Sequence, residues 1–248
     1  MVRHLKIEFR VTDWAAWAPG VQSREDWLAW AKAPFIPHGD GTPALSEVPA
    51  MQRRRIDRLG RMAIQSAYWC QQAEQAGIPF VFASRHGDVA CSVELLQSLA
   101  RTEVLSPTSF GLSVHNAIAA LYSIVRGERG NYTALAAGPA TTATAMVEAA
   151  GLLADGAREV LVVIYDAALP TVYEDFREQA DPFHAWCWKV SNAGQGARLA
   201  LSCTAPGELD PPQAQLPESL EALRFFLAEA AELRQRSDAA EWTWRRAG

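Results

Sequence analysis

The sequence predicts an α/β fold, because strand-like apolar runs alternate along the chain with helix-like segments. Two observations carry this prediction. Residues 159–165 contain the continuous apolar run Val-Leu-Val-Val-Ile, which is typical of a strand covered on both faces. Residues 140–154 are mostly small and apolar and end before Gly156, as expected of a helix that packs closely against its neighbours.

Five further segments have the pattern of strands. Residues 5–12 alternate apolar and polar side chains, as in a half-buried strand. Short apolar runs before sharp turns predict strands at 79–84 and 132–137. Residues 184–190 and 198–203 predict two more strands, joined by a glycine-containing turn in the manner of a β-hairpin.

Helical spacing of apolar residues predicts the helices that connect these strands. Ser23 is a candidate N-cap for the first helix, and Gly77 is a candidate C-cap for a long helix that begins at residue 50. Residues 106–110 predict a break, and the proline-rich stretches 33–49 and 206–217 predict loops. The predicted helices cover residues 24–32, 50–76, the stretch from the turn at 85–88 to 100, 112–125, 140–154 and 220–236.

The chain divides into two predicted parts. Residues 1–205 hold the alternating strands and helices and form one predicted domain. Residues 206–248 are predicted to be a proline-rich linker, an amphipathic helix and a tryptophan-rich tail at 241–246 that packs on that domain.

Composition excludes several classes of function. The 248 residues carry a formal net charge of −5, so they lack the basic balance that nucleic-acid binding requires. No apolar stretch approaches the roughly 20 residues needed to span a bilayer, and residues 1–10 are not followed by the apolar core of a signal peptide. We therefore expect a cytoplasmic protein with no nucleic-acid partner and no membrane span.

Cysteines and histidines give no indication of a metal or cofactor. No two cysteines form a C-x-x-C pair, and no two histidines have the i, i+4 spacing of a helical metal site. We expect free buried thiols, structural histidines, no metal and no cofactor. These residues are Cys70, Cys91, Cys187 and Cys203, with His4, His38, His86, His115 and His184.

The strand–turn–helix unit at 132–154 lies where α/β proteins often place a nucleophile. The amino terminus of a helix lowers the pKa of a thiol and stabilises an oxyanion. This sequence instead has Gly138, Pro139 and Ala140 at the turn, and none of them carries a nucleophilic side chain. Thr141 and Thr142 follow, and a capping or solvated role is the simpler interpretation of their hydroxyls because no histidine adjoins them.

The order of these parts resembles the β-ketoacyl synthase family over residues 1–203. The resemblance lies in the basic segment that opens the long helix, the turn after the next strand, the "SP…F…N…S-I" stretch and the strand–elbow–helix–strand unit. These segments are residues 51–59, 84–87, 106–124 and 130–166.

The resemblance implies an inactive synthase. Counting back from Ala149 and Ala150, the reactive cysteine of the family falls on Pro139, or on Gly138 if the register slips by one. The family also carries two catalytic histidines and a lysine in a C-terminal half that has no counterpart here. The implied fold is the N-terminal half of a thiolase-like layered sandwich.

Chain-length factors are relatives of this kind, and the resemblance implies the partners that they have. The expected partner is a full-length ketosynthase subunit in a heterodimer, with an acyl carrier protein as a further partner, in fatty acid, polyketide or aryl-polyene biosynthesis. The arginines at 53–58 are candidates for carrier docking, although a solvated helix face is the competing interpretation. The residues expected at the acyl tunnel or partner contact are Thr108, Phe110, His115, Asn116, Ala136 and Ala137, and the docking arginines are Arg53, Arg54, Arg55 and Arg58.

Two other functions remain open from the sequence. One is acyl transfer by a different nucleophile, either Thr141, Thr142 or Cys91 beside a histidine. The other is a stand-alone protein that binds acyl chains. Half of a layered sandwich is also expected to leave sheet edges and apolar faces uncovered, which predicts self-association of the isolated chain.

Overall fold

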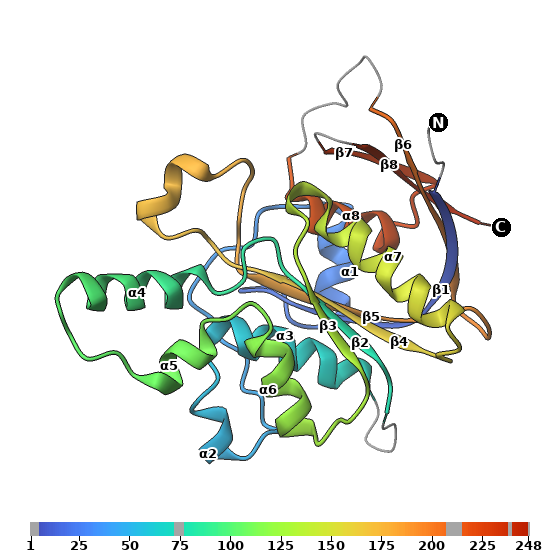
Figure 1. The fold of residues 1–248 in the computed structure, drawn as a ribbon. Helices are drawn as coiled ribbons and strands as arrows, with labels where there is room; N and C mark the ends of the chain where they lie inside the picture. Colours follow the sequence, from blue (N-terminus) through green and yellow to red (C-terminus); the bar gives the residue numbers. More distant parts are fainter. Residues whose placement is uncertain (1–4, 72–76, 207–214, 238–239, 248) are drawn as a thin grey trace.

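The computed structural model describes residues 5–71, 77–206, 215–237 and 240–247. Their strands form an eight-stranded mixed sheet in the order β3-β2-β4-β5-β1-β6-β8-β7, with helices packed on both faces (Figure 1). The predicted α/β class is therefore confirmed. Three parallel strands stand at one end of the sheet, namely β3 (Tyr132–Leu135), β2 (Phe80–Ala83) and β4 (Val160–Asp166).

The first strand, β1 (Leu5–Trp17), lies in the middle of the sheet and separates two strands that are neighbours in sequence. β5 (His184–Ser191) pairs with residues 10–17 of β1, and β6 (Ala197–Thr204) pairs with residues 5–11 on its other side. The expectation of a β5–β6 hairpin is therefore wrong, although both strands exist. The connection crosses over β1 instead, and a Cβ atom on Gly196 would stand 2.3 Å from the Val11 carbonyl oxygen.

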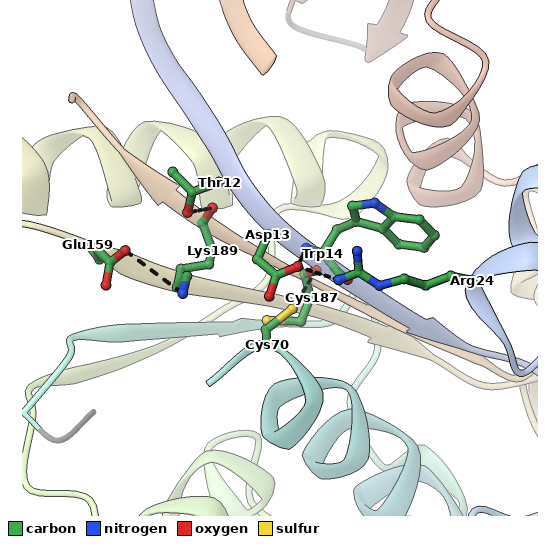
Figure 2. Close-up of polar contacts among 8 residues, drawn as sticks. All are labelled: Thr12, Asp13, Trp14, Arg24, Cys70, Glu159, Cys187 and Lys189. Carbon is green, nitrogen blue, oxygen red and sulfur yellow. Dashed lines mark hydrogen bonds and ion pairs between the residues drawn. The ribbon is translucent and has the colours of Figure 1, made fainter. Parts of the chain in front are cut away.

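A β-bulge interrupts β1 at this crossing. The register with β5 shifts between Val11 and Asp13, and the Thr12 hydroxyl donates to the Lys189 carbonyl at 3.1 Å. Figure 2 shows Asp13 beside the Arg24 guanidinium, with which it forms an ion pair. Such bulges bend a strand and increase its twist, which suits a strand that changes neighbours along its length.

Buried thiols line the other side of this region. The Cys70 Sγ donates to the Cys187 carbonyl at 3.3 Å (Figure 2). Burial raises the pKa of the Cys70 thiol, so this group stays protonated and unreactive. All four cysteines are free; Cys91 and Cys203 are only partly buried.

Each face of the sheet carries its own core. α1 (Arg24–Lys32), α7 (Thr141–Ala154) and α8 (Glu218–Leu227) cover one face, which includes the large side chains of Trp186, Trp188 and Trp244. α3 (Arg58–Cys70) and α6 (Ala117–Arg126) cover the other. α1 and α8 thus cover part of one apolar face of the sheet, and self-association of the isolated chain stays a prediction.

Two predicted helix boundaries are wrong for a shared reason. The segment predicted as one helix over 50–76 contains α2 (Ala50–Arg53) and α3, and α3 starts anew where the Asp57 side chain accepts from the Gly60 N–H at 2.7 Å. α3 ends at Cys70, and residues 72–76 lie outside the described residues. The predicted break at 106–110 is the start of α5 (Pro107–Leu112), which Ser106 caps. Capping side chains thus start helices at both places.

The C-terminal segment differs most from expectation. α8 ends at Leu227, and the predicted helix gives way after a short turn to β7 (Glu232–Ser237). The tryptophan-rich tail is β8 (Ala240–Arg246), which pairs with β6 and therefore extends the same sheet. Of the predicted 206–217 loop, residues 207–214 lie outside the described residues.

Three segments project from one side of the molecule. They are α4 (Val89–Ala100), α5 and the loop between β4 and β5, which contains a short 3-10 helix, η2 (Thr171–Phe176). Figure 1 shows all three reaching beyond the end of the sheet. They carry the large exposed apolar side chains Leu96, Leu99, Phe110, Val172 and Phe176.

Candidate functional site

The elbow predicted from the sequence lies between β3 and α7. β3 ends at Leu135, and a 3-10 turn, η1 (Gly138–Ala140), leads into α7. Gly138 has a φ of +53°, a left-handed conformation that glycine adopts without steric cost. The Thr141 hydroxyl closes this turn, because it accepts from the Ala137 N–H at 3.0 Å and donates to the Gly138 carbonyl at 2.8 Å. The backbone of a nucleophile elbow is present without a nucleophilic side chain at the turn.

Both threonines after the turn are engaged. Thr141 and Thr142 are buried, so a solvated role is wrong, and the predicted helix-capping role is also wrong because α7 has no side-chain cap hydrogen bond. The Thr142 hydroxyl donates to Oε2 of Glu218 on α8 at 2.9 Å. Neither hydroxyl contacts a histidine in the described hydrogen-bond pattern, and a threonine nucleophile would need such a base.

The expected tunnel residues separate into two groups. The His115 side chain contacts the end of β3, because its Nε2–H donates to the Leu135 carbonyl at 3.0 Å. Ala136 and Ala137 are the two residues after Leu135 and therefore lie close to this contact. Thr108 and Phe110 lie on the exposed surface of α5. Asn116 precedes α6, and its side chain makes no cap hydrogen bond.

The four docking arginines have unequal surroundings. Arg53 donates to the Leu45 carbonyl at 3.1 Å, and Arg58 donates to the Gly39 carbonyl at 2.6 Å while it stacks over the Phe183 ring. Arg53 therefore ties the 39–45 loop region to the end of α2, and Arg58 ties it to the start of α3. Arg54 and Arg55 are exposed.

A polar cluster that the sequence did not reveal lies at the carboxyl ends of β2 and β4. The Ser84 hydroxyl and the Arg85 N–H both donate to Oδ1 of Asp166 at 2.9 Å. On the neighbouring strand β5, His184 donates from Nδ1 to the Pro182 carbonyl at 2.8 Å and accepts at Nε2 from the Ser219 hydroxyl at 2.7 Å. Carboxyl ends of parallel strands are where α/β proteins bind their ligands.

Burial controls the charges of this cluster. It raises the pKa of Asp166 to about 6 and that of Glu218 to about 8. It lowers the pKa of His184 to about 4. Near neutral pH, His184 and Glu218 are therefore uncharged.

The His184–Ser219 pair has the contacts of a base and a nucleophile, but it has no access to a substrate. Both side chains are buried. The adjoining cavity, lined by Arg85, Asp166 and His184, measures about 10 Å³, which is room for about one water molecule. The pair therefore serves to hold α8 against β5.

This cluster escaped sequence reasoning because its members come from four separate segments, at residues 84–85, 166, 182–184 and 218–219. Asp166 ends an apolar strand, which is a weak signal of a polar site. Glu218 and Ser219 follow Pro217 and read as an ordinary helix start. Among the described residues, no group of three or more His, Cys, Asp or Glu side chains is arranged to hold a metal ion.

The fold and the elbow define a class of layered α/β proteins that present a turn at the amino end of a central helix. The family model of the β-ketoacyl synthase N-terminal domain matches residues 27–245. The chain belongs to this family, and the expected resemblance and thiolase-like fold are confirmed. In the described part of the chain, no helix has the length and apolar character to cross a membrane.

Solved structures give the same assignment. A chain from the complex of the ketosynthase ApeO with its chain length factor ApeC, from Xenorhabdus doucetiae, is 27% identical, with a TM-score of 0.82 over 97% of this chain and 100% of that chain. The ishigamide ketosynthase/chain length factor is 16% identical, with a TM-score of 0.68 over 97% and 99% of the two chains.

A third structure shares the fold at low identity. It is the AntDE:AntF complex of a type II acyl carrier protein with its ketosynthase, which is 9% identical with a TM-score of 0.72 over 98% of this chain and 100% of that chain. Comparison with curated protein sequences gives no match.

Proposed function

We propose that the chain is a non-catalytic, chain-length-factor-like subunit that pairs with a β-ketoacyl synthase of a type II system. The observation that carries the proposal is the elbow itself. A chain of this family has Pro139 where the reactive cysteine is expected, and Pro139 has no group that could hold an acyl chain. The likeness to a chain from a ketosynthase/chain length factor complex supports the same role.

The outer edge of β3, which pairs with no other strand among the described residues, supports a protein partner. β3 is the first strand in the sheet order, and its sequence Tyr-Thr-Ala-Leu contains no charge. The opposite edge strand, β7, carries Glu232, Arg234 and Arg236, which are the kind of side chains that prevent edge-to-edge pairing. A partner that continues the sheet therefore fits at β3.

The exposed side chains of α5 support a role in shaping an acyl tunnel. Phe110 is 63% exposed, and α5 packs beside α6 and α4. In a complex formed through β3, such a side chain is available to the partner's substrate. Arg54 and Arg55 are the arginines best placed to meet an acidic carrier protein, because Arg53 and Arg58 already bind loop carbonyls.

The first experiment is co-expression with the ketosynthase encoded nearest to it, followed by pull-down and native mass spectrometry. A one-to-one complex that elongates acyl chains only when both subunits are present is the expected result. Acyl products identified in this assay will show whether the pathway makes fatty acids, polyketides or aryl polyenes. A monomer that binds acyl chains without a synthase would contradict the proposal.

The role of Phe110 gives a more specific test. Phe110→Ala should change the chain-length distribution of the products while the complex still forms, because the change opens space beside the growing chain. Phe35→Ala is the matched control, since Phe35 is also exposed but lies outside the projecting segments. An unchanged distribution in the Phe110 variant would argue against a tunnel role.

Acyl transfer by another nucleophile has no such support. The hydroxyls of Thr141 and Thr142 are buried and hydrogen-bonded within the fold. Burial raises the pKa of the Cys91 thiol, which lowers its thiolate fraction and thus its reactivity.

A further inference from the structure

The first turn of α8 is fastened to four other parts of the fold by polar contacts. Thr142 of α7 donates to the Glu218 carboxyl, and His184 of β5 accepts from Ser219. Trp186, also on β5, donates from Nε1 to the Ser219 carbonyl at 3.1 Å. The two remaining contacts use the Glu218 backbone, whose N–H donates to Gln179 Oε1 at 3.2 Å and whose carbonyl accepts from Gln235 Nε2 at 2.8 Å.

One atom in this arrangement lacks a partner. The Oε1 atom of Glu218 is shut off from solvent and has no hydrogen-bond partner among the described residues. An ionised carboxylate in this position would leave half of its charge without a partner, which costs much more free energy than an unpaired neutral acid. Donation from Thr142 favours the ionised form of Glu218, but burial of the carboxyl outweighs it and favours the protonated form.

The charged groups around Glu218 act in opposite directions. The Asp166 carboxyl on β4 raises the pKa of Glu218, and the Arg85 guanidinium lowers it. Arg85 forms an ion pair with Glu178 of the β4–β5 loop. The Glu178 carboxylate therefore offsets part of the effect of Arg85 on Glu218. His184 on β5 is uncharged at neutral pH, Asp181 of the loop is bound to the Leu169 N–H, and Glu221 lies one turn further along α8.

We propose that Glu218 is a protonation-dependent latch: its neutral form holds the first turn of α8 against α7 and the 167–183 loop, and loss of its proton releases both. The loop is included because Gln179 binds the Glu218 N–H directly. The same loop carries the exposed side chains of Val172 and Phe176 on the projecting side of the molecule.

The direction of the pH dependence follows from the burial of Glu218. Its pKa is about 8 in the closed state, against 4.5 for an exposed glutamate. The released state therefore binds fewer protons than the closed state throughout this window, so the closed state loses stability as the pH rises from about 4.5 to about 8. Asp166 has the same direction, but its pKa of about 6 places most of its effect below neutral pH.

Hydrogen exchange measured by mass spectrometry on the full chain tests the latch. Between pH 7 and pH 9, after correction for the intrinsic exchange rates, protection of residues 167–183 and 218–223 should fall about tenfold in the wild type. In Glu218→Gln, which cannot ionise, protection of the same residues should stay constant. Glu148→Gln is the matched control, because Glu148 accepts from Thr133 at a different part of α7, and this variant should respond as the wild type does.

An equal loss of protection in the wild type and in Glu218→Gln would overturn the latch. If Glu218→Gln does not fold, ¹³C NMR titration of the wild-type Glu218 carboxyl gives the second measurement, and a pKa below about 6 would also overturn it. Neither measurement uses a synthase, so failure of the latch leaves the proposed function standing. If both hold, synthase binding should weaken at alkaline pH, a consequence that rests on the proposed function.

Discussion

Gly196 lies where the chain crosses over β1, and no other residue fits there. Its φ of +134° is a conformation that L side chains rarely adopt, and an added Cβ would stand 2.3 Å from the Val11 carbonyl oxygen. Gly194, two residues earlier, also has a positive φ but has open space around its Cβ position. A side chain at Gly194 would therefore meet backbone strain alone, whereas a side chain at Gly196 would meet both strain and a steric clash.

We expect Gly196→Ala to destabilise the fold by about 3 kcal/mol or more, because the added methyl group must push β1 away from the crossing. Gly194→Ala should cost about 1–2 kcal/mol, which is the strain of a positive φ alone. Urea unfolding of both variants measures the difference. Equal losses would mean that the close approach at Val11 is relieved by small shifts of the loop.

The elbow could be predicted from the sequence because its residues are consecutive. Gly138, Pro139 and Ala140 follow a short apolar run and precede a helix, and this local pattern was sufficient to place the turn. The cluster around Asp166 and Glu218 could not be predicted in this way. Its contacts join residues that are distant in sequence, such as Ser84 and Asp166, and only the folded sheet brings them together.

At the scale of elements, the strands β1 to β6 were predicted, β7 and β8 were missed, and the ends of several helices were predicted poorly. Asp57 and Ser106 both lie within segments whose apolar spacing gave no sign of a start, yet each caps a new helix. A capping contact depends on one side chain and one N–H group, so periodicity does not detect it. The 232–237 segment is polar and charged, and it is a strand because β8 provides its partner.

The tail strand β8 gives the prediction at this scale. Trp244 is fully buried, packs against Trp188 and Phe225, and donates from Nε1 to Gln235 at 2.8 Å. Trp244→Ala should destabilise the fold by about 3–5 kcal/mol, as expected when a large core side chain is removed. Trp69→Ala should cost less than about 1 kcal/mol, because Trp69 is 43% exposed.

Thermal or urea unfolding of the two tryptophan variants makes the comparison. A small effect of Trp244→Ala would mean that β8 and β7 are dispensable additions to the sheet. The large expected effect would show that residues 240–246 belong to the core on which α8 packs.

At the scale of the whole molecule, the two edge strands of the sheet differ in charge. β7 carries charged side chains, and β3 carries none. The Phe80 N–H donates to the Asn131 carbonyl and the Ser84 N–H donates to the Leu135 carbonyl. The intervening even-numbered residues, Tyr132 and Ala134, therefore direct their backbone groups away from β2 and toward any added strand. The predicted exposure of an edge thus applies to β3, while α7 packs on the neighbouring strands β2 and β4.

Ala134→Pro removes one outward N–H group and leaves the pairing with β2 intact. We expect the affinity for the synthase to fall at least about tenfold, equivalent to about 1.4 kcal/mol, with little change in the unfolding of the isolated chain. Ala134→Ser, which keeps the N–H group, is the control. Unchanged affinity in the proline variant, measured by titration of the two purified subunits, would place the partner elsewhere.

The position of β1 in the middle of the sheet has a consequence for the order of synthesis. Residues 5–17 are made before both of their neighbours, which begin only at His184 and Ala197. About 170 residues must leave the ribosome before β1 can pair, which at roughly 5–20 residues per second takes on the order of ten to thirty seconds. During that interval, both edges of the β1 segment are unpaired on the nascent chain. A chaperone that binds this segment, or a slower rate of translation across the span, would therefore change the yield of folded protein. Neither would change the stability of the folded state.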